Sequence, residues 1–323
     1  MNIGLVGIGQ IAAYQIEAIA CVPGLTLVDA CDRNPDRSAR LLPGITFHES
    51  LDSFLRKSRA DLVIVSTPNA THADVASRVL EAGRPVLLEK PAATSAAELD
   101  QLVATAQAKG IFLSVAFHAA FALDALWLLE RIRSGDLHLG SPSGFHCGFY
   151  DPYLSNGTLS SAATGLGGSW YDSGINALSL VARFWDVSQL EVTEGRMTSI
   201  PSVPCSQIQG AADVAIRLPG GHRGRGSIDT NWTLGLNRKT TQLFFEASHM
   251  SVLLNHSAET VVIREGDREI ASHALGTGRP RLVNHYIGLY ADLKSRFARS
   301  ENNLDLALPL HKLLYSAATW HLT

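Results

Sequence analysis

Apolar runs of strand length alternate with helical patterns over the first 120 residues of the chain. The apolar runs cover residues 3–6, 25–30, 62–66, 86–88 and 111–116. Between them, apolar residues recur three and four positions apart, as on one face of a helix, over residues 11–20, 71–82 and 96–109. Because these strands are apolar throughout rather than at alternate positions, the pattern predicts a parallel sheet covered by helices on both faces. We expect residues 1–120 to form one doubly wound α/β domain.

The pattern changes after residue 120. An amphipathic helix is predicted over residues 123–133, a loop rich in glycine and serine over 151–168, and a helix over 170–184. Strand patterns then dominate, over residues 213–218, 226–232, 242–246, 251–254 and 260–264. Their hairpin-like spacing predicts a mostly antiparallel sheet, and helices follow over 282–299 and 308–320. We expect residues 121–323 to form a second, α+β domain whose C-terminal helices return to the first domain.

Composition and charge exclude several classes of protein. Apolar residues make up 46% of the 323 positions and charged residues 18%, a balance typical of globular chains. The 27 basic and 30 acidic residues give a net charge of −3, so no basic excess is available to bind nucleic acid. No apolar run approaches the roughly 18 residues of a membrane span. Four scattered cysteines and the lack of a secretory leader pattern predict a cytoplasmic protein.

The turn after the first predicted strand carries a pattern typical of dinucleotide-binding domains. Residues 7–12 read G-I-G-Q-I-A, in which Gly7 permits a tight turn, Gly9 lets a pyrophosphate approach the backbone, and Ala12 lets the helix pack closely. The pattern is weak alone, but here a strand precedes it and a helix follows. The sequence therefore predicts a dinucleotide site that includes Gly7, Gly9, Gln10 and Ile11.

A carboxylate at the end of the second predicted strand extends this site. Asp32 lies 20 residues beyond Ala12, where an acidic side chain accepts hydrogen bonds from the adenosine ribose hydroxyls. The alternative interpretation is a solvated acid in a turn. Asp32 would repel a 2′-phosphate, which favours NAD, whereas the guanidinium of the adjacent Arg33 would attract that phosphate. NAD is the expected cofactor, and use of NADP stays open.

Two further segments are more specific. Residues 66–72 read S-T-P-N-A-T-H, and residues 81–91 read E-A-G-R-P-V-L-L-E-K-P. With the opening turn they resemble the glucose–fructose oxidoreductase/inositol dehydrogenase (Gfo/Idh/MocA) family. The resemblance implies an N-terminal Rossmann domain, a C-terminal domain with a large open antiparallel sheet, and a Pro91 peptide that is often cis. It also implies that the following residues bind the cofactor: Thr67, Pro68, Asn69, His72, Glu89 and Lys90.

Lys90 is a candidate catalytic residue on physical grounds as well. It follows a predicted strand at the carboxyl end, where open α/β sheets bind their ligands. An ammonium there can stabilise the oxygen that gains charge during hydride transfer. The alternative is an ordinary surface lysine at the end of a strand. Glu89 either orients Lys90 or caps a loop.

The second domain supplies a second polar pair. The segment 167–178 occupies the place of the family's G-G-G-x-x-x-D-x-G-x-H motif, with Asp172 as the acid and Asn176 where many members carry histidine. Four residues apart on a helix, the two side chains point the same way. An amide holds a hydroxyl but transfers no proton near neutral pH, so proton transfer is assigned to Lys90 or Asp172. A helix-capping or packing amide is the alternative for Asn176.

The same stretch resembles the subgroup of aldose 1-dehydrogenases that act on L-arabinose and D-galactose. The resemblance implies that His118 contacts the sugar. The alternative, almost equally favoured, is a histidine that packs in the core. Trp170 and Tyr171 are expected to stack on a sugar or, equally, to pack in the core. The residues around 32–33 and 231–232 depart from the subgroup, which puts the substrate in doubt.

The sequence thus predicts an NAD(P)-dependent dehydrogenase that oxidises C1 of an aldopyranose to the lactone. The alternatives are oxidation of a secondary alcohol on an inositol or modified sugar, and a non-catalytic regulator that binds nucleotide and sugar. No histidine spacing typical of a metal site occurs, and no metal is expected. We expect the open sheet to expose apolar surface and to join copies of the chain into a homodimer or homotetramer.

Overall fold

The computed structural model describes residues 1–163 and 165–318. The backbone divides into two compact units, which are described separately. Unit 1 comprises Met1–Phe117 and Tyr286–Leu308, and unit 2 comprises His118–His285 and Pro309–Thr323. Within the described residues no helix is long and apolar enough to cross a membrane.

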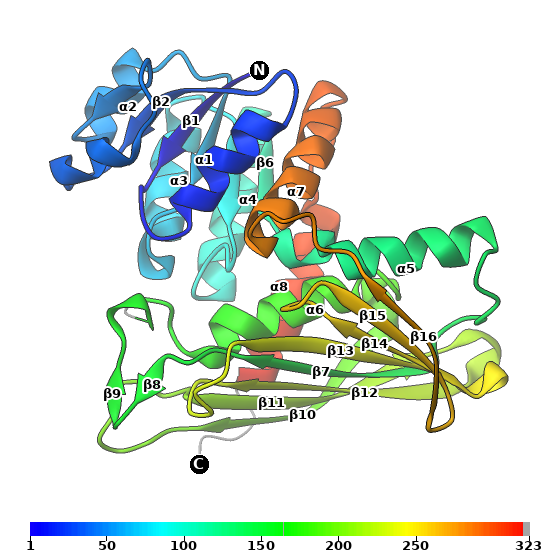
Figure 1. Cartoon of the computed structure of the whole chain (residues 1–323). Helices are drawn as coiled ribbons and strands as arrows, with labels where there is room; N and C mark the ends of the chain where they lie inside the picture. Colours follow the sequence, from blue (N-terminus) through cyan, green and yellow to red (C-terminus); the bar gives the residue numbers. More distant parts are fainter. Residues whose placement is uncertain (164, 319–323) are drawn as a thin grey trace. The chain divides into compact units, whose positions relative to one another are not determined.

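Unit 1 is built on a six-stranded sheet in the order β3-β2-β1-β4-β5-β6. Figure 1 labels β1, β2 and β6 of this sheet. Every neighbouring pair is parallel. This order is that of doubly wound dinucleotide-binding domains and confirms the predicted fold class. The strands are β1 (Asn2–Val6), β2 (Thr26–Cys31), β3 (Thr46–His48), β4 (Leu62–Val65), β5 (Val86–Glu89) and β6 (Leu113–Ala116).

Helices connect these strands. They are α1 (Ala12–Cys21), α2 (Leu51–Lys57), α3 (His72–Glu81) and α4 (Ala96–Lys109), and the greater part of α7 (Arg281–Ala298) joins them. Helix α4 shows why the sequence folds this way. Ser95 accepts a hydrogen bond from the Glu98 amide at its start, and Gly110 ends it in a left-handed conformation. The pattern did not reveal β3 and α2, which have only three and seven residues.

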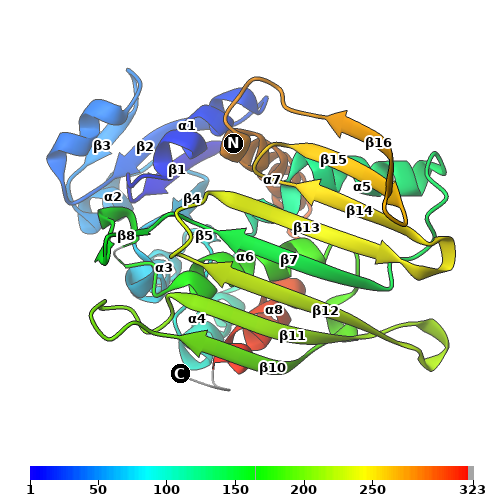
Figure 2. The ribbon, with the colours of Figure 1, turned by 60° about the horizontal axis from the view of Figure 1, so that its bottom comes forward.

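Unit 2 is built on an eight-stranded sheet in the order β10-β11-β12-β7-β13-β14-β15-β16 (Figure 2). The sheet is antiparallel except between β12 and β7. A mostly antiparallel C-terminal sheet is thus also confirmed. Its strands are β7 (Gly144–Tyr150), β10 (Leu190–Thr198), β11 (Gln209–Arg217), β12 (Arg223–Asn231), β13 (Arg238–Phe245), β14 (Met250–Asn255), β15 (Thr260–Glu265) and β16 (Arg268–Ala274).

Helices of unit 2 lie behind the strands in the view of Figure 2. They are α5 (Leu123–Ser134), a π-helical turn (Trp170–Gly174), α6 (Ile175–Val181) and the last part of α8 (Leu304–Ala318). Buried residues alternate with half-exposed ones along the strands, so one face of the sheet forms the core. Gly195 of β10 has no room for a side chain, because a Cβ would lie 2.1 Å from the Ala317 carbonyl oxygen of α8.

Several details differ from the sequence-based expectation, among them β10 and β16, which lie outside the expected strand ranges. Strand β7 lies in the middle of the sheet, although its glycines and His146 interrupt the apolar pattern. The loop expected over 151–168 contains a small hairpin of β8 (Leu154–Ser155) and β9 (Thr158–Leu159). The helix expected from residue 170 begins with the π-helical turn. Trp320, at the end of the last predicted helix, lies outside the described residues.

Candidate functional site

The turn between β1 and α1 has the shape that its glycines predict. Gly7 has φ +96°, and a Cβ there would lie 2.5 Å from the Ser66 carbonyl oxygen at the end of β4. The fold itself therefore requires glycine at this position. At Gly9 a Cβ would approach only the Arg37 guanidinium, at 3.8 Å, an ordinary contact. The space beside Gly9 is therefore open. A ligand that lies against the backbone of the turn needs such space.

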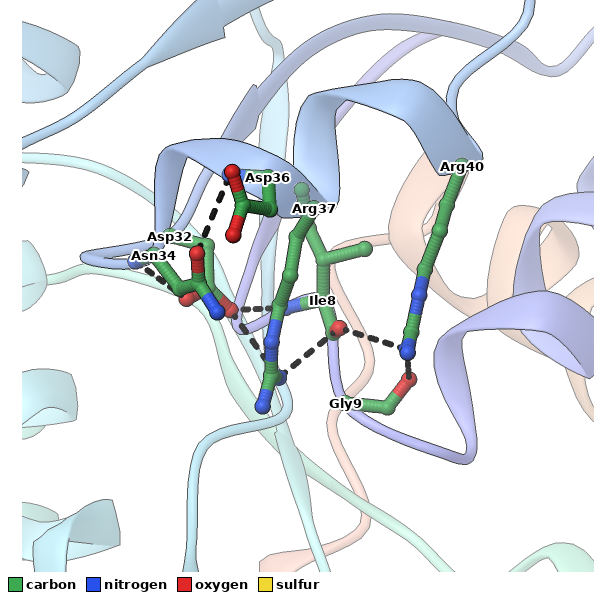
Figure 3. Close-up of polar contacts among 7 residues, drawn as sticks. All are labelled: Ile8, Gly9, Asp32, Asn34, Asp36, Arg37 and Arg40. Carbon is green, nitrogen blue, oxygen red and sulfur yellow. Dashed lines mark hydrogen bonds and ion pairs between the residues drawn. The ribbon is translucent and has the colours of Figure 1, made fainter.

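Asp32 follows β2 and faces this turn (Figure 3). Its Oδ2 accepts hydrogen bonds from the Ile8 amide at 2.7 Å and from Arg37 Nη1 at 3.3 Å, and its Oδ1 accepts from the Asn34 amide at 2.9 Å. The side chain is 13% exposed. A carboxylate offers about four acceptor positions, so Asp32 retains capacity for a ribose hydroxyl.

Two arginines that sequence reasoning missed hold the same turn. Arg37 Nη1 donates to the Ile8 carbonyl at 2.8 Å, and Arg40 Nη1 donates to the Gly9 carbonyl at 3.1 Å (Figure 3). Both belong to a 3₁₀ helix (Pro35–Arg40) that begins with a proline after the Asn34 cap. Arg33, the arginine expected to face the 2′ position, is exposed. The sequence did contain a signal for these two residues. Asn34 and Pro35 are typical of the start of a helical turn, and arginines three residues apart on such a turn point to the same side.

The segment after β4 is held by His72 at the start of α3. Its buried ring places Nδ1 2.7 Å from the Pro91 carbonyl oxygen and Nε2 2.7 Å from the Thr67 carbonyl oxygen. Burial lowers the pKa of this imidazole. The two carbonyl contacts raise the pKa, and the nearby Lys90 ammonium lowers it. His72 thereby ties the predicted cofactor-binding segment at 67–72, which includes Pro68 and the buried Asn69, to the segment at 89–91.

Glu89 lies at the end of β5 inside a buried polar cluster. Its Oε1 accepts hydrogen bonds from Gln15 Nε2 at 2.9 Å and from Tyr286 Oη at 2.7 Å, and its Oε2 accepts from the Lys90 amide at 3.2 Å. Burial raises the pKa of the Glu89 carboxyl. Glu89 therefore connects β5 to α1 and α7. Lys90 is half-buried, and the Lys90–Pro91 peptide is cis, as the resemblance implied.

These residues fit a dinucleotide. No side chain caps the N-terminus of α1 in the described structure, and no acidic residue stands in its first turn. The helix therefore presents its backbone amides and the positive end of its dipole to an anion such as a pyrophosphate. Gly9 leaves the turn uncovered, and Asp32 follows the adjacent strand. The remaining turn residues, Gln10 and Ile11, lie between Gly9 and the helix.

In unit 2, Asp172 and Asn176 lie on consecutive helical turns and are both 9% exposed. Asn176 Nδ2 donates to the Asp172 backbone carbonyl at 3.1 Å. Asn176 Oδ1 is buried and has no hydrogen-bond partner among the described residues. Unpaired buried acceptors are costly, so this oxygen is suited to accept a hydrogen bond from a ligand hydroxyl.

The aromatic candidates occupy different environments. Trp170 is fully buried, and its Nε1 donates to the Leu314 carbonyl of α8 at 2.9 Å. Its ring belongs to the packing of unit 2, so a sugar would have to open this packing to stack on it. Tyr171 is half-buried, with its ring 6.2 Å from that of Tyr315, and burial raises the pKa of its hydroxyl. His118 is buried, and its Nδ1 lies 3.4 Å from Nδ1 of His285.

An ion pair that the sequence did not reveal lies beside the Asp172 turn. Lys239 Nζ contacts Asp151 Oδ1 at 2.5 Å, and the two side chains are 8% and 11% exposed. Asp151 Oδ2 accepts a hydrogen bond from Ser173, the residue after Asp172, at 2.9 Å. Burial lowers the pKa of Lys239, while Asp151 and Asp172 oppose that shift. These residues are far apart in the sequence, so no local pattern could have found them.

Within unit 1 the structure joins Asp32 to the glycine turn, and it joins Thr67 to Pro91 through His72. Within unit 2 it places Asp172 and Asn176 on consecutive helical turns. In the described parts of the chain, no three histidine, cysteine, aspartate or glutamate side chains lie close enough together to hold a metal ion.

A parallel sheet in this strand order, with a glycine turn against α1 and a carboxylate after β2, defines unit 1 as a dinucleotide-binding domain of the Rossmann class. Residues 1–117 match the model of the Gfo/Idh/MocA family, described as an oxidoreductase family with an NAD-binding Rossmann fold. The chain is thus similar to this family over that domain.

Two curated relatives are similar to part of the chain. Inositol 2-dehydrogenase 1 of Saccharopolyspora erythraea is 32% identical over 153 residues, which are 46% of this chain and 45% of the relative. D-glucoside 3-dehydrogenase of Escherichia coli is 29% identical over 141 residues, 42% of this chain and 40% of the relative. The matches thus span about half the length of these relatives or less.

A solved structure is similar over nearly the whole chain. It is that of KijD10, a 3-ketoreductase from Actinomadura kijaniata, in complex with NADP and TDP-benzene. The TM-score is 0.80 at 19% identity, covering 99% of this chain and 97% of the other. At this identity the likeness shows that the two chains share a fold.

Proposed function

We propose that this protein is an NAD(P)-dependent dehydrogenase that oxidises an alcohol carbon of a sugar or polyol, with C1 of an aldopyranose of the L-arabinose or D-galactose type as its substrate carbon. The observation that carries the proposal is the pair formed by Asp172 and Asn176. A carboxylate beside an amide with an unpaired buried oxygen suits a polyhydroxylated substrate, because one group accepts a proton and the other holds a hydroxyl.

The chain's own residues take three roles in this reaction. A bound nicotinamide dinucleotide supplies the hydride acceptor. Asp172 accepts the proton of the substrate hydroxyl, and the Lys90 ammonium stabilises the charge that develops on the same oxygen. In the alternative assignment a neutral Lys90 is the base and Asp172 tunes it electrostatically. Asn176 positions the sugar under either assignment.

We propose that NAD binds in preference to NADP, because Asp32 faces the turn with its carboxylate. Arg37 and Arg40 lie beside it and offset part of this charge, so the preference is expected to be moderate. Repulsion of a 2′-phosphate corresponds to about 1–3 kcal/mol, or roughly tenfold to a hundredfold in affinity. Asp32→Ala is expected to narrow or reverse the difference.

A second candidate reaction is oxidation of a secondary alcohol on an inositol or a modified sugar. It is favoured by the two curated relatives, an inositol 2-dehydrogenase and a D-glucoside 3-dehydrogenase, whose names describe oxidation away from C1. Asn176 weighs against it mildly, since it stands where the family pattern often has histidine.

We also propose that copies of the chain associate through the uncovered face of the unit 2 sheet. This face mixes polar contacts, such as the 2.8 Å hydrogen bond between His146 and Ser227, with apolar positions such as Leu253 and Val262. It is less apolar than the sequence led us to expect. Gel filtration is expected to give a dimer or tetramer, and a monomer of about 35 kDa would refute it.

The function is tested by absorbance at 340 nm with NAD or NADP and a panel of aldoses, inositols and uronates. Turnover of arabinose or galactose supports the first reaction, and turnover of inositol the second. Lys90→Ala and Asp172→Ala are expected to lower kcat by about 10²–10⁴-fold, whereas Asn176→Ala is expected mainly to raise KM. Dinucleotide binding without turnover of any substrate would instead point to a non-catalytic regulator.

A further inference from the structure

Gln207, in the segment between β10 and β11, is a buried amide with an unpaired oxygen. The residue is 5% exposed, and its Oε1 has no hydrogen-bond partner among the described residues. Burial raises the pKa of the Tyr171 hydroxyl, and a hydrogen bond from the Gln207 side chain opposes this rise. The amide nitrogen therefore faces Tyr171, and Oε1 is left over. Because an unpaired buried acceptor is costly, this oxygen is suited to accept a hydrogen bond from a ligand.

The Gln207 side chain lies directly against the glycine turn that precedes the π-helical turn. The Ser169 amide donates to the Gln207 carbonyl at 2.7 Å. Gly168 has φ +122°, and a Cβ there would lie 2.6 Å from Gln207 Cβ and 3.3 Å from Gln207 Oε1. The Gln207 side chain thus fills the place that a side chain at position 168 would take. Gly167 and Ser206, which precede these two residues, are exposed, so the contact lies directly below the surface.

Gly168, Asp172 and Asn176 form one row along the helical segment. They are four residues apart, a spacing at which positions on a helix are neighbours. The Asp172 amide donates to the Gly168 carbonyl at 3.0 Å, and Asn176 Nδ2 donates to the Asp172 carbonyl at 3.1 Å. Since Gln207 fills the side-chain position of Gly168, it adds an amide at the start of this row. The carboxylate of Asp172 is then flanked by two amides.

The two amides have the same unfilled requirement. Asn176 Oδ1 and Gln207 Oε1 are both buried, and neither has a hydrogen-bond partner in the parts of the chain that the structure describes. An amide oxygen only accepts hydrogen bonds, so each of the two needs a donor. Among the groups of a sugar or polyol, the hydroxyls supply such donors. Two amides in one row therefore suit a ligand with free hydroxyls on at least two carbons.

We propose that Gln207 is a second hydroxyl-binding residue for the substrate: its Oε1 accepts a hydrogen bond from a hydroxyl that is not oxidised, while Asn176 holds another. The inference rests on the proposed function in one respect, namely that the ligand is a sugar or polyol. It depends neither on which carbon is oxidised nor on which residue takes the proton. It assigns a role to a residue that no motif of the chain includes.

The test is a binding cycle in which one hydroxyl of the sugar and the amide of Gln207 are removed separately and together. The ligands are D-galactose and its analogues that lack the hydroxyl at C2, C3, C4 or C6. They are titrated by calorimetry into the full-length protein with NADH, so that no oxidation occurs. In the wild type, at least one analogue is expected to bind about tenfold more weakly than galactose, because a hydrogen bond is lost.

The variant Gln207→Met removes the amide and keeps a side chain of similar length. Galactose is expected to bind it about tenfold more weakly than it binds the wild type. For one of the analogues that bind the wild type weakly, the difference from galactose is expected to disappear in this variant, because the amide that recognised the missing hydroxyl is gone. If Gln207→Met weakens galactose and every analogue by the same factor, the amide contacts no hydroxyl and the inference is overturned.

Two controls separate binding from a structural role. Gln209→Met changes the same residue type two positions later, where Nε2 donates to Thr233 at 3.2 Å, and is expected to keep the wild-type affinities. Without ligand, Gln207→Met is expected to melt within about 2 °C of the wild type, because Oε1 has no partner to lose. A much lower melting temperature with unchanged galactose affinity would overturn the inference. If Gln207→Met does not fold, Gln207→Asn withdraws the amide by one carbon and is expected to lose the same affinity.

Binding and turnover together keep the inference distinct from the proposed function. A cycle that links one hydroxyl to Gln207 without oxidation of any sugar would support the inference and refute the function. Oxidation of galactose with wild-type affinity in Gln207→Met would refute the inference alone. If galactose does not bind, the cycle is run with myo-inositol and its deoxy analogues. Absence of binding by both galactose and myo-inositol would refute the inference and the function together.

Discussion

The two units build their polar sites from different groups. Around the glycine turn and the segment at 67–72 of unit 1, side chains bond mostly to the main chain: Asp32 to two amides, Arg37 and Arg40 to turn carbonyls, and His72 to the carbonyls of Thr67 and Pro91. Glu89, which accepts from the side chains of Gln15 and Tyr286, is the exception. In unit 2, the corresponding bonds join side chains to one another, as in the contacts of Asp151 with Lys239 and Ser173.

This difference determines which kind of substitution damages each site. A site built on backbone carbonyls and amides depends on the path of the chain, so a residue that alters the path is the damaging one. A site built from buried charges depends on their balance, since an unpaired buried charge costs several kcal/mol. We therefore expect unit 1 to be most sensitive at its glycine turn and unit 2 at its ion pair.

The largest expected effect is on the stability of the buried pair. Lys239→Met should lower the free energy of unfolding by about 3–5 kcal/mol, because it leaves Asp151 buried without its cation. Arg37→Met breaks the Arg37–Asp32 ion pair beside the glycine turn of unit 1, whose partners are 35% and 13% exposed, and should cost about 1 kcal/mol or less. Urea unfolding followed by circular dichroism measures both variants.

A double variant sharpens this comparison. Asp151→Asn/Lys239→Met removes both charges and should recover a large part of the stability lost in Lys239→Met, because no unpaired charge stays buried. If the double variant is as unstable as the sum of the two single ones, the loss arises from packing rather than from charge. Equal losses in Lys239→Met and Arg37→Met would remove the distinction between the two units.

The next largest effect concerns the glycine turn. Gly7→Ala should destabilise the protein by about 2 kcal/mol or more, because its φ is +96° and its Cβ would meet the Ser66 carbonyl at 2.5 Å. Gly9→Ala meets no contact closer than 3.8 Å and should fold normally. Its expected defect is in dinucleotide affinity, measured by titration calorimetry. Unfolding curves of equal midpoint for Gly7→Ala and wild type would contradict this reading of the turn.

The fold was predictable to the extent that its signals are local. Continuous apolar strands alternating with helices gave the parallel sheet, and short spacings between strands gave the antiparallel one. Strand β7 escaped because only Phe145, Cys147 and Phe149 carry its buried face, between glycines and a histidine. Its place in the sheet comes from its pairing with β12 and β13, whose paired residues follow 81 to 100 positions later and leave no mark in the local pattern.

The same limit applies to the sites. Gly7, Gly9 and Asp32 could be predicted as site residues because one turn and the end of the next strand contain them all. Asp151 and Lys239 are 88 residues apart, and only the register of β7 and β13 brings them together. Likewise, the apolar character of Trp170 is compatible with both core packing and sugar stacking, and only its bond to Leu314 distinguishes them.

The smallest expected effect is a pH dependence confined to unit 2. His285 is buried, its Nδ1 contacts Nδ1 of His118, and its Nε2 has no hydrogen-bond partner in the described part of the chain. Burial holds its pKa well below the usual value of 6.5, and the nearby Arg281 and His256 add to the effect. The imidazole is therefore neutral in the folded protein at neutral pH.

The sign of the effect follows from this lowered pKa. As the pH falls below about 6.5, the unfolded chain binds a proton at His285 and the folded chain does not, so stability decreases by up to about 1.4 kcal/mol per pH unit until the folded pKa is reached. His285→Gln removes this site of protonation from the unfolded chain. Between pH 6.5 and 5, the free energy of unfolding of the variant should therefore depend less steeply on pH, by up to about 1.4 kcal/mol per pH unit. His222→Gln, at an exposed position, is the control and should keep the wild-type slope. Tryptophan fluorescence in urea reports the transition of unit 2, since the residues of unit 1 include no tryptophan. An unchanged slope in His285→Gln would mean that this histidine is protonated in the folded protein as readily as in the unfolded chain. That result would contradict the neutral state assigned to the buried imidazole.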